Sequence, residues 1–166
     1  MSSSQPVLVL LDSRRHDRAG FESGEPSLDR YLREQAVQHH RDGISTTHVL
    51  VAHEGANEVL GFYSLSAAQV RLTDLQDADR KRLPRYPVPA IRMARLAVAR
   101  EQQGRGYGEL LVAYAVDRCL GLRAELGLRL LLVDALHEKA AAFYARYGFR
   151  NTTEGALTLY LPLGTR

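Results

Sequence analysis

Three glycines at alternate positions, Gly104, Gly106 and Gly108, stand between an apolar run at residues 91–99 and a long helical pattern at residues 108–126. The apolar run has the length and composition of a strand, and the apolar residues of the helical pattern recur every three or four positions. A strand that enters a helix through glycines brings backbone N–H groups and the positive end of the helix to one place. The pattern therefore predicts an anion site suited to pyrophosphate, although a purely structural turn explains the glycines about as well.

Two other glycine-rich phosphate loops do not match this turn. A P-loop ends in Gly-Lys-Ser/Thr, which is missing here. A Rossmann loop requires an acidic residue at the end of the next strand, about 20 residues on. Glu125 lies near that distance, but it falls inside the predicted helix. Both alternatives are therefore excluded.

Strand and helix patterns alternate along the rest of the chain. We expect a long helix from Ser27, as its N-cap, to Arg41, and a short helix or loop at 72–83 that Pro84, Pro87 and Pro89 end by interrupting any regular element. Further helices are expected at 108–126 and 139–147, and strands at 6–11, 46–52, 59–65, 91–99, 128–133, at Phe149 and at 157–161. No repeat or linker divides the 166 residues. The sequence thus predicts one α/β domain over residues 1–166, with a mixed central sheet flanked by helices.

The composition is typical of a soluble cytoplasmic protein. The single cysteine, Cys119, cannot form an internal disulfide and lies on the apolar stripe of the helix expected at 108–126, so we predict that it belongs to the core. The N-terminus lacks the basic segment and cleavage site of a secretory signal. Charged residues interrupt every apolar stretch before it reaches the roughly 20 residues that span a bilayer.

Positive charge concentrates in the middle of the chain. Between residues 80 and 105 a single acid, Glu101, accompanies eight basic residues: Arg80, Lys81, Arg82, Arg85, Arg92, Arg95, Arg100 and Arg105. Arginine is the better bidentate partner for phosphate, although a solvated surface is the commoner explanation of such a run. Arg95 could instead pair with an acid in the core. The cluster at residues 14–18 is a weaker candidate, and the pair His39-His40 is too sparse for a metal site, so no metal is implied.

A second motif lies at residues 143–149, Phe-Tyr-Ala-Arg-Tyr-Gly-Phe. Taken alone, it is typical of an amphipathic helix that ends at a left-handed glycine, Gly148, with its aromatic residues in the core. Together, the two motifs resemble those of the GNAT superfamily of N-acetyltransferases. The turn at 103–108 is similar to the acetyl-CoA motif Gln/Arg-x-x-Gly-x-Gly/Ala, and residues 143–149 are similar to the Phe-Tyr-x-x-x-Gly-Phe signature.

The resemblance implies the GNAT fold, acetyl-CoA as acetyl donor and a site built from the matching positions. Tyr144 would protonate the departing thiolate, a transfer for which a phenol near pKa 10 is well matched. Cofactor-binding residues would be Leu96, Ala97, Val98, Gln103, Gly104, Arg105, Gly106, Tyr107 and Gly108. The segments at 21–32 and 95–98 resemble the GNAT toxins of bacterial toxin-antitoxin modules, which acetylate aminoacyl-tRNA and are neutralised by a ribbon-helix-helix antitoxin. Such proteins often form homodimers.

Two positions depart from the family pattern. Many relatives have Cys where this chain has Ser23, a change expected to affect only packing. Many also have Asn, which contacts pantetheine, where this chain has His137. No general base stands out, because Glu101, Asp134, His137 and Glu138 are each more typical of surface or capping positions. An α-amino group with a pKa of about 7.7–8.0 needs a base far less than a lysine amine of about 10.4, which favours aminoacyl-tRNA as substrate.

If the substrate is tRNA, the basic run gains a purpose, with Arg80, Lys81, Arg82, Arg85 and Arg92 holding RNA phosphates. Two alternatives stay open. One is a GNAT enzyme acting on a small amine or a protein amino group, with solvated arginines. The other is a non-catalytic module that binds CoA or nucleic acid.

Overall fold

The computed structural model describes residues 5–81, 83, 87–153 and 155–164. They form two compact units. The first contains Met1–Leu65 and Arg95–Tyr114, and the second contains Ser66–Ala94 and Ala115–Arg166. The expectation of a single domain over residues 1–166 stays a prediction. None of the described helices combines the length and the apolar character needed to cross a membrane.

The described strands form a mixed sheet in the order β1-β2-β3-β4-β5-β7-β6. Neighbours β1, β2 and β3 are antiparallel, β4 and β5 are parallel, and β7 is antiparallel to both β5 and β6. The predicted fold class is therefore confirmed. The strand bounds are β1 Val7–Leu10, β2 Thr46–Val51, β3 Gly61–Val70, β4 Val88–Val98, β5 Leu130–Asp134, β6 Arg150–Asn151 and β7 Thr158–Pro162.

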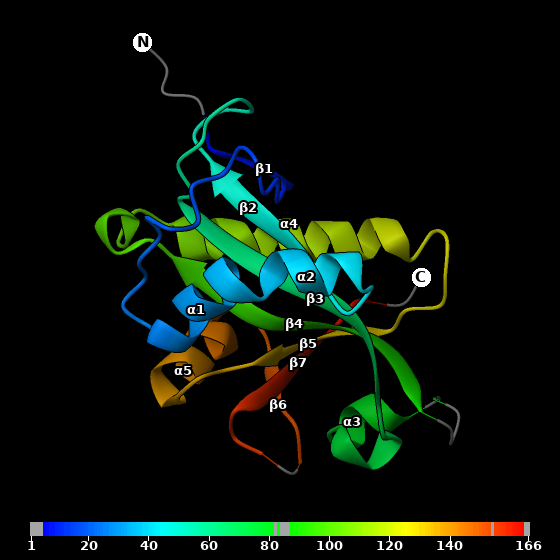
Figure 1. The fold of residues 1–166 in the computed structure, drawn as a ribbon. Coiled ribbons are helices and arrows are strands. Elements are labelled where there is room, and N and C mark those ends of the chain that lie inside the picture. Colours follow the sequence, from blue (N-terminus) through cyan, green and yellow to red (C-terminus); the bar gives the residue numbers. More distant parts are fainter. Residues whose placement is uncertain (1–4, 82, 84–86, 154, 165–166) are drawn as a thin grey trace. The chain divides into compact units, whose positions relative to one another are not determined.

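In the first unit, helices α1 (Pro26–Glu34) and α2 (Ala36–Arg41) lie over β2 and β3 (Figure 1). Their apolar faces share a buried core with those strands, which includes Phe21, Tyr31, Leu32, Ala36, Val49 and Phe62. The prediction of one continuous helix from Ser27 to Arg41 is wrong, because the backbone breaks at Gln35, where φ is −123°. Ser27 is not the N-cap either. Glu25 holds that position and Pro26 follows it, where a fixed φ and a missing N–H cost nothing.

The second unit places η1 (Leu72–Asp74) and α3 (Asp77–Arg80) where a short helix or loop was expected, and adds α5 (Glu138–Arg146) against β7. Its core joins Val70, Leu75, Val88, Ala90, Leu130, Leu132 and Tyr160.

Pro89 lies inside β4, so the prediction that it would interrupt regular structure is wrong. It is exposed near the start of the strand, and its carbonyl accepts the N–H of Arg129 at 3.0 Å. Pro84 lies outside the described residues.

Helix α4 (Tyr107–Leu122) follows the glycine turn and ends four residues earlier than predicted. Cys119 on this helix is fully buried, which confirms that it belongs to the core. Burial raises the pKa of its thiol to about 11, with Arg118 opposing the shift. A thiol with so high a pKa carries almost no thiolate at neutral pH, so Cys119 is a poor nucleophile.

Candidate active site

The glycine turn connects η2 (Arg100–Gln102) to the first turn of α4. Gly104 and Gly106 have φ values of +84° and +83°, the left-handed region that other residues rarely adopt. A Cβ atom added to either glycine would meet nothing within 4 Å. These glycines are therefore required by backbone conformation rather than by crowding, and the space beside them is open.

Six consecutive backbone amides in this turn and at the start of α4 have no acceptor among the described residues. No described residue accepts a hydrogen bond from the N–H groups of residues 104–109, and the first helical bond runs from Leu110 N to Gly106 O at 3.0 Å. The N-terminus of a helix also carries partial positive charge. Free amides, a positive helix end and room for an oxyanion are together what a pyrophosphate needs, so the turn fits the CoA pyrophosphate.

Gln103 holds the turn in place. Its side-chain Nε2 donates to the carbonyl oxygens of Ser23 at 2.8 Å and Val98 at 3.0 Å. Both of its amide hydrogens are thus used within the protein. Gln103, predicted to bind cofactor, therefore acts on the turn by fixing it to the end of β4 and to the loop before α1.

Ser23 belongs to a buried polar network that the sequence did not reveal. Its hydroxyl donates to Asp29 Oδ1 at 2.6 Å, and its N–H lies 3.0 and 3.1 Å from the two carboxylate oxygens. Ser23 and Asp29 are only 7% and 4% exposed. The expectation that a Ser-to-Cys change at this position affects only packing stays a prediction, and the contact shows what the change would remove, because the hydroxyl donates to a buried carboxylate. The only sequence signal for this network was a Ser and an Asp six residues apart around the start of a helix.

The end of β4 carries the residues predicted to bind pantetheine. Ala97 is buried, whereas Leu96 and Val98 are partly exposed. Gly61 on β3 lies so close to this strand that a Cβ there would stand 2.8 Å from the carbonyl oxygen of Ala97. The pantetheine contacts of residues 96–98 stay predictions.

In the second unit, Tyr144 lies on the last turn and a half of α5 and is 5% exposed. Its ring packs at an angle against Phe143 and Phe149, with centroids 5.3 and 5.5 Å away. Burial, followed by the negative charge of Asp134, raises the pKa of the phenol well above its usual value. Tyr144 therefore keeps its proton throughout the physiological pH range and is available as a donor. Gly148, with φ of +92°, ends the helix as predicted.

The general-base candidates have other partners or remain exposed. Both carboxylate oxygens of Asp134 accept hydrogen bonds from the guanidinium of Arg92, at 2.6 and 2.7 Å. The Nδ1 atom of His137 caps α5 by accepting the N–H of Ala140 at 3.1 Å, which confirms its expected capping role. Glu101 and Glu138 are exposed. The described contacts therefore single out none of these side chains as a general base.

The predicted RNA contacts divide into three groups. Lys81 is exposed and Arg80 is half-buried, with its guanidinium bound to Asp77 at 2.8 Å. Arg92 is occupied by Asp134. Arg82 and Arg85 lie outside the described residues. Arg95, which could have paired with a core acid, instead stacks its guanidinium over the ring of Tyr31, 3.7 Å from the centroid.

Within the described residues, no group of three or more His, Cys, Asp or Glu side chains could hold a metal ion.

Known proteins resemble this chain over nearly its whole length. The model of the acetyltransferase (GNAT) domain matches residues 45–151. A protein of Mycobacterium tuberculosis named tRNA-acetylating toxin is 42% identical over 87% of this chain and 85% of its own. The structure of AtaT complexed with acetyl-methionyl-tRNAfMet has a TM-score of 0.88, 29% identity and 95% coverage of both chains. A mutant AtaT bound to the C-terminus of the antitoxin AtaR and acetyl-CoA has a TM-score of 0.81, 28% identity, and coverage of 96% and 94%.

Proposed function

This chain belongs to the GNAT acetyltransferase family, and we propose that it is a toxin that acetylates the α-amino group of aminoacyl-tRNA and so blocks translation. The single observation that carries the proposal is the 42% identity to a tRNA-acetylating toxin over most of both chains. The AtaT complex with an acetylated aminoacyl-tRNA supports the same substrate class.

Acetyl-CoA supplies the acetyl group as a thioester. The free amides of residues 104–109 are assigned to its pyrophosphate, and Gln103 keeps the turn in shape. The backbone of Leu96, Ala97 and Val98 is assigned to pantetheine and to the thioester carbonyl. The amine nitrogen forms a bond to the carbonyl carbon, the carbon–sulfur bond breaks, and Tyr144 gives its proton to the sulfur.

The pKa of Tyr144 suits this role. Burial raises the pKa of this phenol, so Tyr144 still carries its proton at neutral pH when the strongly basic thiolate forms. The substrate amine loses a proton to water or buffer, because an α-amino group is already partly neutral near pH 7.5. A dedicated base is therefore unnecessary for this substrate.

We propose that basic residues of the run at 80–92 bind the RNA backbone. Arg80, Lys81, Arg82 and Arg85 would contact phosphates and position the acceptor end without reading sequence. Arg92 is the weakest member of the set, since a contact with RNA would cost it the bond to Asp134.

The same relatives support an antitoxin partner for this chain. The AtaT neighbour is bound to the C-terminus of its antitoxin. We propose that the partner of this chain is an antitoxin with a ribbon-helix-helix DNA-binding domain and that the chain forms a homodimer. We also propose that it acts in the cytoplasm, where aminoacyl-tRNA is found.

The test is transfer from labelled acetyl-CoA to total charged tRNA, followed by identification of the labelled amino acid. We expect label in the RNA fraction that is lost when the aminoacyl ester is hydrolysed. Tyr144→Phe, in which the proton donor is removed, serves as the low-activity control. Label in small amines or in protein, with none in RNA, would replace the toxin assignment with that of an amine or protein acetyltransferase.

A further inference from the structure

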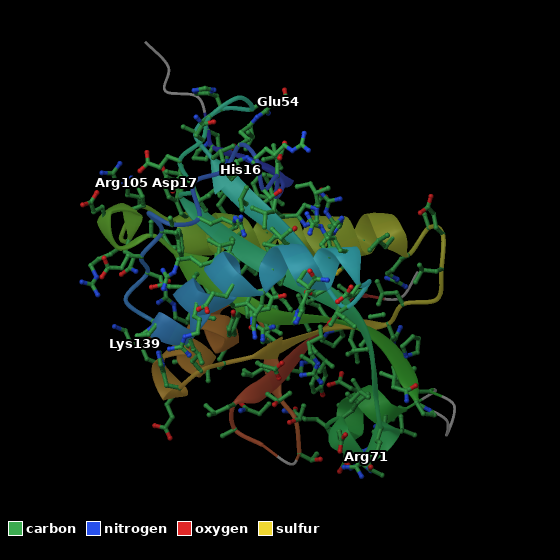
Figure 2. The ribbon with its side chains drawn as sticks, viewed as in Figure 1. His16, Asp17, Glu54, Arg71, Arg105 and Lys139 are labelled. Atoms are coloured by element: carbon green, nitrogen blue, oxygen red, sulfur yellow. The ribbon has the colours of Figure 1, made fainter. Side chains whose placement is uncertain are left out.

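The loop between β1 and α1 carries a basic cluster, Arg14-Arg15-His16-Asp17-Arg18, that the proposed function does not use. His16, Asp17 and Arg18 line a cavity of about 290 Å³, together with Ala19 and Arg33 of α1. Figure 2 shows His16 and Asp17 on this loop. All of these residues belong to the first unit.

His16 presents a buried donor that has no partner. The side chain is 5% exposed, and its Nδ1 accepts the backbone N–H of Asp12 at 2.9 Å. In a neutral imidazole the remaining proton must then sit on Nε2. No described residue accepts a hydrogen bond from Nε2. Buried donors without an acceptor are rare in native proteins, which makes this N–H a marker for something that binds there.

The charge state of His16 strengthens this reading. Burial lowers the pKa of the imidazole, Asp12 opposes that shift and Arg15 adds to it. The ring therefore stays neutral at physiological pH, keeps its bond to Asp12, and offers a fixed N–H at Nε2.

Two arginines supply positive charge to the same cavity. Arg18 donates one N–H to the carbonyl of Arg33 at 3.3 Å, and Arg33 donates one to the carbonyl of Phe21 at 3.3 Å. No described carboxylate forms an ion pair with either guanidinium. Each guanidinium has five donors, so most of them remain available. Asp17 contributes one negative charge, but its Oδ1 already accepts the N–H of Gly20 at 3.0 Å.

We propose that this cavity is a binding site for one phosphodiester of the RNA backbone, held by Arg18 and Arg33 and by the Nε2–H of His16. The two guanidiniums match phosphate geometry, and their charges outnumber that of Asp17. The assignment of the phosphate to RNA rests on the proposed function, in which the substrate is a tRNA. The site adds a contact region outside the basic run at 80–92.

The first test measures binding of deacylated total tRNA by fluorescence anisotropy over a range of salt concentrations. We expect Arg18→Gln with Arg33→Gln to weaken binding about tenfold at low salt and to reduce the slope of log K against log salt by about one, the loss of one phosphate contact. Arg30→Gln is the matched control, because Arg30 is also exposed on α1 and faces Glu34 at 3.9 Å rather than the cavity. An unchanged slope in the double variant overturns the proposal.

The second test separates the donor of His16 from its structural bond. His16→Asn keeps an acceptor near Asp12 but removes the Nε2 donor, whereas His16→Gln can place an amide N–H near the position of Nε2. We expect the Asn variant to bind tRNA several-fold more weakly at an unchanged Tm, and the Gln variant to recover part of the affinity. Equal tRNA affinity in both variants and the wild type would mean that Nε2 binds only water.

Two further outcomes identify the source of the phosphate. If the double variant binds acetyl-CoA more weakly and tRNA normally, the assignment to RNA is wrong. If the wild type acetylates no aminoacyl-tRNA and the double variant still loses tRNA affinity, the proposed function fails while the phosphate site stands.

Discussion

The glycine turn and helix α5 present their functional groups in opposite ways. The turn offers backbone amides of residues 104–109, none of which has an acceptor among the described residues. Helix α5 offers one side-chain hydroxyl, on Tyr144, whose ring packs against the rings of Phe143 and Phe149. A site made of backbone depends on conformation, whereas a site made of one side chain depends on a single chemical group.

Their electrostatic surroundings differ in the same way. The turn is exposed at the positive end of α4, so it attracts an anion. Tyr144 is buried and lies in the field of Asp134, so its phenol resists ionisation. The first region is suited to binding a permanent negative charge, and the second to keeping a proton on a neutral phenol until a strong base forms. Substitutions should therefore separate acetyl-CoA affinity from turnover.

The largest effect is expected from Tyr144→Phe. The variant keeps the ring and its packing but loses the proton donor, so kcat should fall about 100-fold or more if proton transfer limits the rate. Acetyl-CoA affinity should stay within about twofold, because the turn that we assign to acetyl-CoA is untouched. Steady-state kinetics and isothermal titration calorimetry measure the two quantities.

Tyr114→Phe is the matched control, since it removes a phenol hydroxyl that bonds to the carbonyl of Pro6 at 3.1 Å. Its kcat should stay that of the wild type. The pH profile of the wild type provides a second check. Because the pKa of Tyr144 is raised, the protonated donor persists as pH rises, and kcat should not fall near pH 10. Alkaline loss near pH 10 would show that the donor has the ordinary pKa of a tyrosine and that burial does not raise it.

The second largest effect is expected from Gly106→Ala. An alanine at φ +83° is disfavoured by roughly 1–2 kcal/mol, so the turn should leave the conformation that aligns its amides. Acetyl-CoA affinity should fall by about five- to thirtyfold, with kcat at saturation little changed. Calorimetric titration of acetyl-CoA tests this.

Gly121→Ala is the matched control, because Gly121 is a helical glycine of α4 whose added Cβ also meets nothing within 4 Å. That variant should keep its acetyl-CoA affinity and gain up to about 1 kcal/mol of unfolding free energy. A Gly106→Ala protein with normal affinity would show that the left-handed backbone is not needed for binding.

The comparison also explains what the sequence could predict. Backbone requirements leave clear signals, and the positive φ values of Gly104, Gly106 and Gly148 were foreseeable because only glycine adopts them freely. The alternation of strands and helices followed from hydrophobic periodicity. Breaks within a predicted helix were harder to foresee from the sequence. The end of α1 at Gln35 has no glycine or proline to mark it.

Side-chain partners were the least predictable part of the site. The ion pair of Arg92 with Asp134 joins residues 42 positions apart, and the stacking of Arg95 on Tyr31 joins two segments that no local pattern connects. Such partners depend on strand register. The register of β4 against β5 places Arg92 opposite Leu132, two residues before Asp134, and it exists only once the sheet has formed.

The network behind the turn gives the third prediction. Ser23→Cys should lower the free energy of unfolding by about 1 kcal/mol, because a thiol is a weak donor to the buried carboxylate of Asp29. Urea unfolding measures this loss. Acetyl-CoA affinity should change little, since the backbone carbonyl of Ser23 still accepts from Gln103. Equal stability of the Cys variant would mean that the hydroxyl contributes only volume.

The smallest effect is expected from Arg105→Gln, within the same turn as Gly106. Arg105 is exposed, Figure 2 shows its side chain directed away from the ribbon, and no described carboxylate pairs with it. An exposed charge contributes little, so acetyl-CoA affinity should fall by no more than about threefold. Titration at low and high salt measures both the loss and its screening. Gly106→Ala removes no charge, and Arg105→Gln removes no backbone freedom. The ratio of their losses in acetyl-CoA affinity therefore compares the contribution of the backbone with that of the guanidinium. A tenfold loss in Arg105→Gln that high salt abolishes would assign the pyrophosphate to the guanidinium instead of the amides.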